Sequence, residues 1–495
     1  MKIKKIIKTL LTILVLMTSS CKTKGNEMKI DERYQSEYRN QYHYSDLNSW
    51  LNDPNGFVYY KGVYHIFYQK SNGINCDVSK MSWGHATSTD LIHFKQEEDA
   101  IVYDEVGSIW SGTCVVDKNN DSKLFDDENG GLVAFYTLRD DNNIQQQAMA
   151  YSKDDGKTWI KYNNGKAIIA SNDDPLKNNE FRDPKVIYSE KFNKYLMFVA
   201  GGNLRIYSSK NLIDWEIESF DTKINTECPD IFILKANDNV SKYVLSCGGR
   251  TYLIGDLKLV DNKIHFVPDN YTYKPFNFGV DAYATQTFYN SERVIGAAWM
   301  STWEYAGKCA YYYDEFNGAF SMFYEYSLVN ENNEYYIKLN PIKEYSNLLL
   351  KDTRKELSVT DNIIDNVYTG RTFKTAVSFE NKKDLVFNIL LKSKDSSLII
   401  KYDESINVLT VDRTKQKNYA SKSFLNKYST KIDRNETINI DLYVDKASLE
   451  VVINNGKNVG SFIYFPEDDV NVSINSSVKT NINTISYTLD TMWKK

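Results

Sequence analysis

Short apolar runs of four to eight residues recur along the first three hundred residues of this chain, whereas helical periodicity is nearly absent. One class of run is β-rich throughout: "GVYHIFYQ" (62–69), "GGLVAFYT" (130–137), "NKYLMFVAGG" (193–202), "SKYVLSCGG" (241–249) and "RVIGAAWM" (293–300). A second class shares a Ser, a polar turn and a closing aromatic: "HATSTDLIHF" (85–94), "AYSKDDGKTW" (150–159) and "IYSSKNLIDW" (206–215). In this second class Ser88, Ser152 and Ser208 follow one another at intervals of 64 and 56 residues.

A repeat of this length has room for four strands and their turns. Residues from about 46 to 340 hold five such units. A radial array of four-stranded blades protects the strand edges of an all-β chain by repetition. We therefore predict a five-bladed β-propeller over 46–340. A plain β-sandwich would not explain the recurrent spacing.

From about Thr353 the pattern changes to alternation of apolar and polar residues between Asn-rich turns. Examples are "DLVFNILLKS", "SLIIKYD", "INVLTVDRT" and "INIDLYVDKASLEVVINNG". Strands that alternate in this way suit two packed sheets. We predict a β-sandwich over 353–495, with a short helical linker over 341–352, so the fold class is all-β.

Each propeller unit opens with a polar or acidic cluster directly before its first strand. The clusters are "LNDPNGFVYY" (51–60), "IWSGTCVVD" (109–117), "FRDPKVIY" (181–188), "TECPDIFIL" (226–234) and "VDAYATQTF" (280–288). The first strand of a blade lies nearest the central channel, so equivalent ends of five such strands converge on one mouth. We expect Asp53, Asp183, Glu227 and Asp281 to meet there, although Asp281 on its own fits a structural role equally well.

Carboxylates brought together in this way cannot all ionise freely, so the pKa of at least one rises, while a nearby cation lowers another. A protonated and an ionised carboxyl side by side are what cleavage of a glycosidic bond requires. Arg182, next to Asp183, is the natural local cation, and four tryptophans offer apolar faces for sugar rings: Trp50, Trp83, Trp110 and Trp303. An isolated acid before a strand is usually only a turn cap, but three at matching positions weaken that interpretation.

Composition excludes several classes of function. The net charge of −5 argues against a nucleic-acid surface, and "SCGGR" lacks the Lys and the spacing of a phosphate loop. Beyond Cys21 five cysteines remain, without a CxxC pair, and the five histidines show no ligand spacing, which argues against a disulfide framework and a zinc site. We expect no metal and no cofactor.

The N-terminal "MKIKKIIKTLLTILVLMTSSC" has a basic start and an apolar run too short to span a bilayer. It is typical of a bacterial lipoprotein signal (1–20) with Cys21 as the lipidated first residue. Thr18 stands where a Leu is usual, which leaves ordinary cleavage without lipidation open. We expect residues 21–45 to form a tether and the protein to be exported and lipid-anchored to the cell envelope, at the outer membrane.

These motifs together resemble glycoside hydrolase family 32, the invertases, inulinases, levanases and related β-fructosidases. "WLNDPNG" is similar to the family's first signature, with Leu51 in place of Met, "FRDP" to its second and "ECPD" to its third. "IFYQ", "MSWGHATSTDLIHF", "WSGT" (Phe is usual at Trp110), "AAWMSTWEYA" and the late "DKASLEVVINNG" also match. The resemblance runs from about Trp50 to the C-terminus.

The resemblance implies a fructan or sucrose substrate and double displacement with retention, in which Asp53 is the nucleophile, Glu227 the acid/base and Asp183 the transition-state stabiliser. Arg182 would orient the site. It also implies a sugar-binding lining, formed by Asn52, Asn55, Gln69, Trp83, Trp110, Ser111 and Trp303.

The chain departs from the family at "CAYYYDEFNGAFSMFYEYSL" (309–328), where a Pro-Thr and a later Pro-Arg-Glu-Leu are usual. This departure affects the expected outer wall of the pocket. Three other functions stay open: a fructosyltransferase of the same family, an inverting propeller-type arabinofuranosidase, and a non-catalytic glycan-binding lipoprotein.

Overall fold

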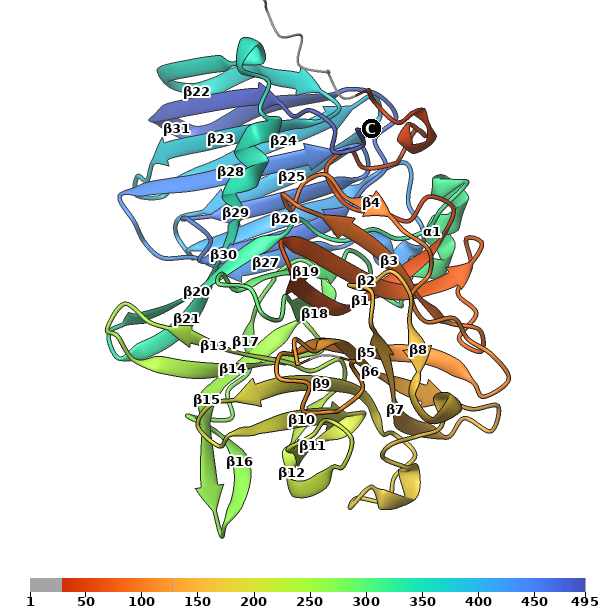
Figure 1. Ribbon diagram of the computed structural model, residues 1–495. Coiled ribbons are helices and arrows are strands. Elements are labelled where there is room, and N and C mark those ends of the chain that lie inside the picture. Colours follow the sequence, from red (N-terminus) through yellow and green to blue (C-terminus); the bar gives the residue numbers. More distant parts are fainter. Residues whose placement is uncertain (1–28, 127, 495) are drawn as a thin grey trace, which may run out of the picture.

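The structure is a computed structural model that describes residues 29–126 and 128–494 (Figure 1). Within those ranges the regular elements are strands, one α-helix, α1 (Ala306–Tyr313), and short 3-10 helices. The 3-10 helices are η1 (Glu32–Tyr34), η2 (Tyr162–Gly165), η3 (Ser171–Asp173), η4 (Lys343–Leu348), η5 (Lys351–Thr353) and η6 (Lys422–Phe424). A ring of five sheets forms one body and a β-sandwich the other, so the predicted all-β class and its two architectures are confirmed.

Each blade of the propeller is built from consecutive strands, paired antiparallel. Blade one has β1 (Ser49–Tyr60), β2 (Val63–Asn72), β3 (Ser82–Ser88) and β4 (Lys95–Gln96). Blade two has β5 (Ser108–Asp117), β6 (Gly131–Arg139), β7 (Gln145–Ser152) and β8 (Ile160–Lys161). Blade three has β9 (Arg182–Ser189), β10 (Lys194–Ala200), β11 (Gly202–Ser209) and β12 (Glu216–Thr226).

Blade four adds a fifth short strand to the pattern. It has β13 (Asp230–Lys235), β14 (Ser241–Cys247), β15 (Thr251–Val260) and β16 (Lys263–Pro268), and β17 (Lys274–Pro275) pairs with the start of β15. Blade five has β18 (Tyr283–Thr287), β19 (Ile295–Trp299), β20 (Tyr324–Glu331) and β21 (Glu334–Pro341).

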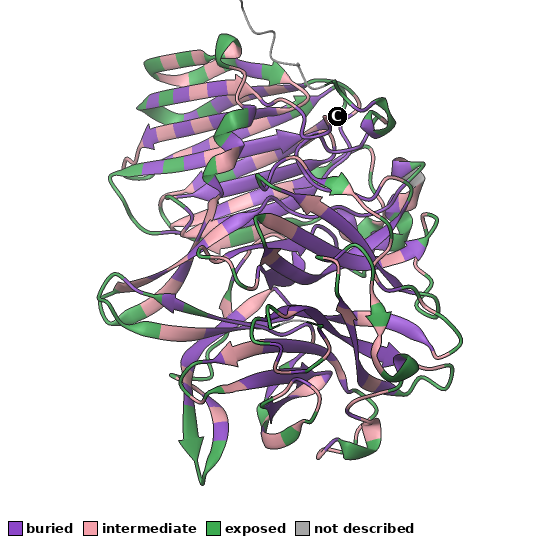
Figure 2. Cartoon of the chain, in the orientation of Figure 1, coloured by how far each residue is buried: buried purple, intermediate pink, exposed green. Residues whose placement is uncertain are grey.

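The first strand of every blade lies at the centre of the ring. β1 contacts β5, β5 contacts β9, β9 contacts β13, β13 contacts β18 and β18 contacts β1, which closes the circle. Of these inner strands β1, β5 and β18 are almost entirely buried, and the centre of the ring is purple in Figure 2. Because the strands run side by side around one axis, their N-terminal ends meet at one mouth of the channel.

The second domain is a nearly closed sandwich. Its strands are β22 (Lys355–Gly370), β23 (Phe373–Glu380), β24 (Val386–Ser393), β25 (Ser396–Asp403), β26 (Val408–Lys415), β27 (Lys427–Lys431), β28 (Thr437–Asp445), β29 (Ser448–Ile453), β30 (Asn458–Ile463) and β31 (Val470–Thr488). β31 pairs with β24 through its first half and with β23 through its second, so it belongs to both sheets. Strands such as β24 and β25 alternate buried and partly exposed side chains, as their sequence pattern predicts.

The segment before the propeller is not a free tether from residue 29 onward, and the prediction for residues 21–45 is wrong over this part. Tyr34, Tyr42 and Tyr44 are buried, and Tyr34 stacks on Trp493 with the ring centroids 4.0 Å apart. Arg39 is fully buried and donates to backbone carbonyls of residues 46 and 47. The partners of this segment lie elsewhere in the fold, so its own polar, aperiodic sequence does not reveal them.

His43 joins the same segment to the sandwich. Its Nδ1 lies 2.8 Å from an Asp445 oxygen and its Nε2 3.2 Å from a Glu450 oxygen, and all three side chains are fully buried. Burial disfavours the imidazolium, but the two carboxylates outweigh it and raise the pKa of His43 to about 9. The segment is therefore held in place by a buried charged cluster.

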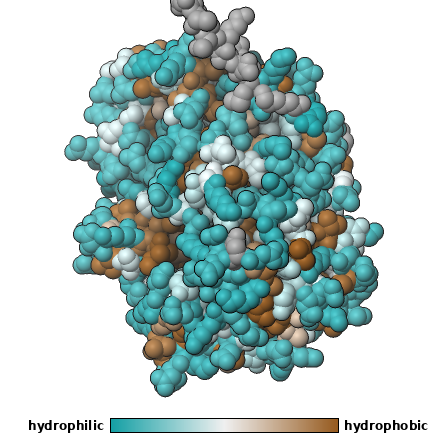
Figure 3. Space-filling view, viewed as in Figure 1, coloured by the Kyte–Doolittle hydropathy of each residue, from teal (hydrophilic) through white to brown (hydrophobic). Residues whose placement is uncertain are grey.

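The predicted signal peptide (1–20) and Cys21 lie outside the described residues. Among the residues that are described, no helix is long and apolar enough to cross a membrane. The face of the molecule seen in Figure 3 is mainly hydrophilic, with separate brown patches.

Candidate active site

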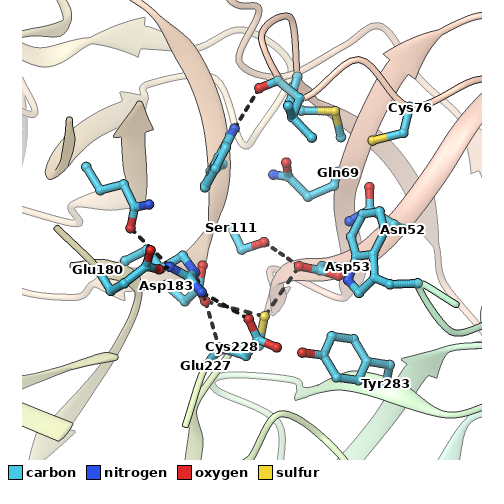
Figure 4. Close-up of a pocket in the computed structure, with 16 residues that line it drawn as sticks. Asn52, Asp53, Gln69, Cys76, Ser111, Glu180, Asp183, Glu227, Cys228 and Tyr283 are labelled. Atoms are coloured by element: carbon cyan, nitrogen blue, oxygen red, sulfur yellow. Dashed lines mark hydrogen bonds and ion pairs between the residues drawn. The ribbon is translucent and has the colours of Figure 1, made fainter. Parts of the chain in front are cut away.

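A pocket of about 300 Å³ opens at the channel mouth where the inner strands converge. All five blades or the segments that join them contribute to its lining. Figure 4 shows the side chains of Asp53, Ser111, Asp183, Glu227 and Cys228 directed toward one space. The volume falls within the range of small-molecule sites, and the convergent polar groups mark it as the candidate active site.

The backbone of the inner strands is irregular where the pocket residues stand. The strand register shifts between Leu51 and Pro54 in β1, between Ile109 and Gly112 in β5, and between Tyr283 and Gln286 in β18. Asp183 and Cys228 have positive φ angles of 62° and 41°, which L-residues rarely adopt. Bulges and strained residues re-aim side chains at functional sites, so the distortion turns these groups from the blades into the pocket.

Asp53 lies deep in the pocket with 8% of its surface exposed. Its Oδ2 accepts hydrogen bonds from the Ser111 hydroxyl at 2.8 Å and from the Cys228 thiol at 3.3 Å. Its Oδ1 is buried and has no hydrogen-bond partner within residues 29–126 and 128–494. Burial raises the pKa of Asp53, and the side chains of Ser111, Asn52 and Cys228 oppose that rise.

Asp183 is equally buried, at 5% exposure. Its Oδ2 accepts the backbone N–H of Cys228 at 2.8 Å and lies 3.6 Å from Arg182 Nε, while its own N–H donates to Thr137 Oγ1 at 2.7 Å. Burial, together with the charges of Asp53 and Glu227, raises the pKa of Asp183 to about 6 although Arg182 opposes the shift. A carboxyl with this pKa exchanges its proton near pH 6.

Glu227 follows directly after β12, and its side chain is 42% exposed, far more than the two aspartates. Arg182 Nη2 donates to Glu227 Oε2 at 3.1 Å, and Arg182 Nη1 contacts Gln145 Oε1 at 3.2 Å and also pairs with Glu180. One guanidinium thus links Glu227 and Asp183. The pocket combines two buried carboxyls, Asp53 and Asp183, with two that reach solvent, Glu227 and Glu180.

Six of the predicted binding residues line this pocket, together with the three acids: Asn52, Gln69, Trp110, Ser111, Arg182 and Trp303. Asn52 Oδ1 accepts the Trp50 indole N–H at 2.7 Å, and Gln69 Nε2 donates to the Ile109 carbonyl at 3.1 Å, so both amides are oriented by neighbours. Trp303 stands at the rim with half of its surface exposed.

Asn55, Trp83 and Trp50 do not line the pocket, which corrects the prediction for them. Asn55 is fully buried and its Oδ1 accepts the Gly112 N–H at 3.2 Å, which ties β1 to β5. Trp83 sits on β3, away from the channel, and its indole N–H donates to the Trp110 carbonyl at 3.0 Å. Trp50 is 1% exposed and packs behind Trp303. These side chains support the pocket wall.

Asp281 is also not part of the pocket. It is fully buried, lies 2.7 Å from Arg413 of the sandwich, and is contacted by the Tyr305 hydroxyl and the Ile463 N–H. Its carboxylate therefore joins the two domains. The divergent stretch 309–328 also packs at this boundary, where Tyr312 stacks on Phe465 with the centroids 4.2 Å apart.

Sequence reasoning missed several lining residues. Cys228, Gln145 and Tyr283 lie inside or beside motifs that the sequence singles out, so their positions were visible although their roles were not. Cys76 and Glu180 stand in loops that carry no pattern of their own. Within the described ranges, no three His, Cys, Asp or Glu side chains are grouped to hold a metal ion.

Two family models match the chain, one for each domain. The Glycosyl hydrolases family 32 N-terminal domain matches residues 43–340, and the Glycosyl hydrolases family 32 C terminal model matches residues 343–489. These two matches cover the propeller and nearly all of the sandwich.

Similar proteins carry related names. A fructan β-fructosidase of Streptococcus mutans is 38% identical over 94% of this chain, which spans only 34% of that protein's length. A levanase of Bacillus subtilis is 30% identical over 94% of this chain and 71% of its own. The crystal structure of an exo-inulinase from Aspergillus awamori superposes with a TM-score of 0.85 at 26% identity, covering 93% of this chain and all of that one. The chain therefore belongs to glycosyl hydrolase family 32.

Proposed function

We propose that the protein is a retaining β-fructosidase that cleaves the β-fructofuranosidic bonds of fructans or sucrose. The observation that carries the proposal is the meeting at the channel mouth of two buried carboxyls, Asp53 and Asp183, with the exposed Glu227, which Arg182 links to Asp183. Retaining glycosidases need one carboxylate as nucleophile and another carboxyl as acid and then base. The names of the similar proteins from Streptococcus mutans and Bacillus subtilis support the choice of a fructan as substrate.

Asp53 is the proposed nucleophile. Ser111 and Cys228 hold Oδ2, which leaves the lone pairs of Oδ1 uncommitted. We assign to Oδ1 the attack on the anomeric carbon, which forms the fructosyl-enzyme ester as the glycosidic C–O bond breaks. The hydrogen bonds to Oδ2 stabilise the ionised form and fix the carboxylate plane, so the attacking atom needs no reorientation.

Glu227 is the proposed acid and base. Its Oε2 is held by Arg182, so the other oxygen delivers the proton to the leaving oxygen in the first step. In the second step the ionised Glu227 takes a proton from water, which attacks the ester and releases fructose with retained configuration. Its greater exposure suits this role, because both the leaving group and the water reach the pocket from solvent.

Asp183 is the proposed stabiliser of the fructosyl ring. Its Oδ2 is fixed by the Cys228 N–H and by Arg182, so the carboxylate is oriented before substrate binds. An ionised, buried carboxylate accepts strong hydrogen bonds from sugar hydroxyls and favours positive charge on the ring of the transition state. Asp183 must therefore lose its proton for full activity.

The test is product analysis with purified protein on sucrose, inulin and levan. The expected result is fructose release, with the β-anomer appearing first by NMR before mutarotation. Asp53→Asn and Glu227→Gln should each lower kcat by about 10⁴-fold or more on natural substrates. Ser79→Ala, in an exposed turn next to the pocket segment, serves as the matched control and should leave turnover unchanged.

Each other outcome supports a different function. Initial release of the inverted anomer would point to the inverting class, and accumulation of longer fructose chains at high sucrose would point to a transferase. Binding without turnover would point to a glycan-binding protein. Full activity of Asp53→Asn would refute the assignment of the nucleophile.

We also propose that the protein is exported and anchored through a lipid on Cys21, on the strength of its N-terminal sequence alone. Metabolic labelling with a fatty acid should mark the wild type and not the Cys21→Ser variant. Labelling of both, or of neither, would refute the anchor.

A further inference from the structure

A fourth carboxyl, that of Glu180, lines the catalytic pocket and has no part in the proposed mechanism (Figure 4). Its Oε2 contacts Arg182 Nη1, the same nitrogen that lies 3.2 Å from Gln145 Oε1. The Glu180 side chain is 54% exposed, whereas that of Arg182 is 18% exposed. Glu180 therefore stands on the solvent side of a guanidinium that the rest of the pocket largely encloses.

The other two nitrogens of this guanidinium face two acids of the proposed reaction. Nη2 donates to Glu227 Oε2 at 3.1 Å, and Nε lies 3.6 Å from Asp183 Oδ2. Each of the three nitrogens is thus directed to a different carboxyl group. Because an arginine keeps its charge at every working pH, these three carboxyls share one permanent positive charge.

The backbone of Glu180 is fixed, although the segment between η3 and β9 has no regular structure. Arg205 is fully buried and binds both oxygens of Asp174, through Nε at 2.9 Å and Nη2 at 2.7 Å. The same Nη2 also donates to the Glu180 carbonyl at 3.1 Å. An exposed ion pair usually contributes little, because both side chains must be ordered to form it. Here the carboxylate starts from a fixed backbone and meets a largely buried guanidinium.

The contact between Arg182 and Glu227 works against the role of Glu227 as an acid. Glu227 needs a proton at the start of the reaction, and a cation beside a carboxyl favours the ionised form. Protonation of Glu227 also takes one counter-charge away from a guanidinium that is only 18% exposed, which is unfavourable. A carboxylate on Nη1 offsets both effects, because it balances the guanidinium whether or not Glu227 carries its proton.

We propose that Glu180 is a positioning residue for the reaction: it holds Arg182 Nη1 as a standing counter-charge, so that Glu227 can take up the proton that it delivers. In this role Glu180 acts through Arg182 and not on the substrate. The inference rests on the proposed function, because the counter-charge matters only if Glu227 acts as the acid.

Other charged or titratable groups also face Glu227, from every element packed around it. They are Asp53 of β1, Arg182 and Asp183 of β9, Cys228 after β12, Cys247 of β14, Arg250 before β15 and Tyr283 of β18. A substitution at position 180 leaves all of these side chains in place. A change in the pH profile of such a variant therefore reports the pair that Glu180 forms with Arg182.

The test is the pH profile of kcat/KM, measured on whichever of sucrose, inulin and levan the wild type cleaves best. Glu180→Gln keeps the size and polarity of the side chain and removes its charge. The basic limb, on which Glu227 loses the proton that it delivers, should move to lower pH by about half a unit, a small shift because Glu180 is more than half exposed. At pH 8 kcat/KM should then fall about threefold, and at pH 6 it should change less than about twofold. The acid limb should move less, because Asp183 faces Nε and not Nη1.

Two further variants separate the charge of Glu180 from its shape. In Gln145→Glu/Glu180→Gln the counter-charge moves to the other partner of the same nitrogen, since Gln145 Oε1 lies 3.2 Å from Nη1, and the basic limb should return toward that of the wild type. Asp173→Asn removes an equal charge at an exposed position seven residues earlier and should leave the profile unchanged. Thermal unfolding of each variant shows whether the fold is intact.

The two proposals fail in different ways. A wild type that releases fructose from none of the three substrates refutes the proposed function. An active wild type whose basic limb is the same as that of Glu180→Gln refutes the counter-charge. A double variant whose limb stays displaced also refutes it, because Glu180 would then act through its shape. An equal displacement in Asp173→Asn does so too, because the effect would then come from the general field of the segment.

Discussion

Asp183→Asn should stabilise the fold at neutral pH while abolishing turnover. Asp183 is 5% exposed, and burial raises its pKa from 3.8 to about 6. Between these two values the folded protein keeps the proton and the unfolded chain loses it. The folded state then binds more protons, so the free energy of unfolding falls as the pH rises from about 4 to about 6 and stays low above that.

The size of this loss of stability follows from the rise in the pKa of Asp183. About two pKa units at 1.36 kcal/mol each correspond to about 3 kcal/mol of stability lost above pH 6. Asparagine is neutral at every pH and its Oδ1 can still accept the Cys228 N–H that Asp183 accepts at 2.8 Å. The variant should therefore avoid this loss, and its Tm should exceed that of the wild type by ~3 °C at pH 7.5.

The assay is thermal unfolding of both proteins from pH 4.5 to 8, followed by circular dichroism. The difference in Tm should be small at the acid end and grow as the pH rises through 6. Asp395→Asn, at a side chain that is 78% exposed, is the matched control and should show no such trend. A variant less stable than the wild type at pH 7.5, or a gain independent of pH, would refute the reasoning.

Three further predictions concern the domain boundary and the catalytic profile. Arg413→Ala should lower the free energy of unfolding by about 3–5 kcal/mol in denaturant titrations, because it leaves the fully buried Asp281 without its cation. A loss below about 1 kcal/mol would contradict this role of Arg413. His43→Gln should be less stable than the wild type by about 3 kcal/mol below pH 6.5, because the pKa of His43 is about 9 in the folded protein and lower in the unfolded chain. This deficit in stability should vanish as the pH rises through 9. A deficit that persists at pH 10 would count against the charged cluster. Turnover should rise with an apparent pKa near 6 on the acid limb as Asp183 ionises, and a flat kcat/KM profile from pH 4.5 to 7 would exclude that assignment.

The repeated strand pattern was sufficient to predict the propeller, because blade strands are local in sequence and pair with their neighbours in order. The same repeat placed Asp53, Asp183, Glu227 and Asp281 at equivalent ends of inner strands, and the first three converge on the pocket. The repeat did not predict that Asp281 turns away to Arg413, nor how deeply each of the other three acids is buried. That order of burial depends on bulges and on positive φ angles, as at Asp183 and Cys228, that the packed blades impose.

The sequence by itself thus determined the fold class and the positions of the three pocket acids, Asp53, Asp183 and Glu227. It could do so because strand periodicity and turn-forming clusters are local properties of the chain. The tertiary structure alone decided that Asp281 belongs to Arg413, 132 residues away, and that His43 belongs to Asp445, 402 residues away. It also decided that Trp83 supports the wall while Trp303 forms the rim. Such pairings follow from how the two domains pack against each other, and no local pattern of residues encodes them.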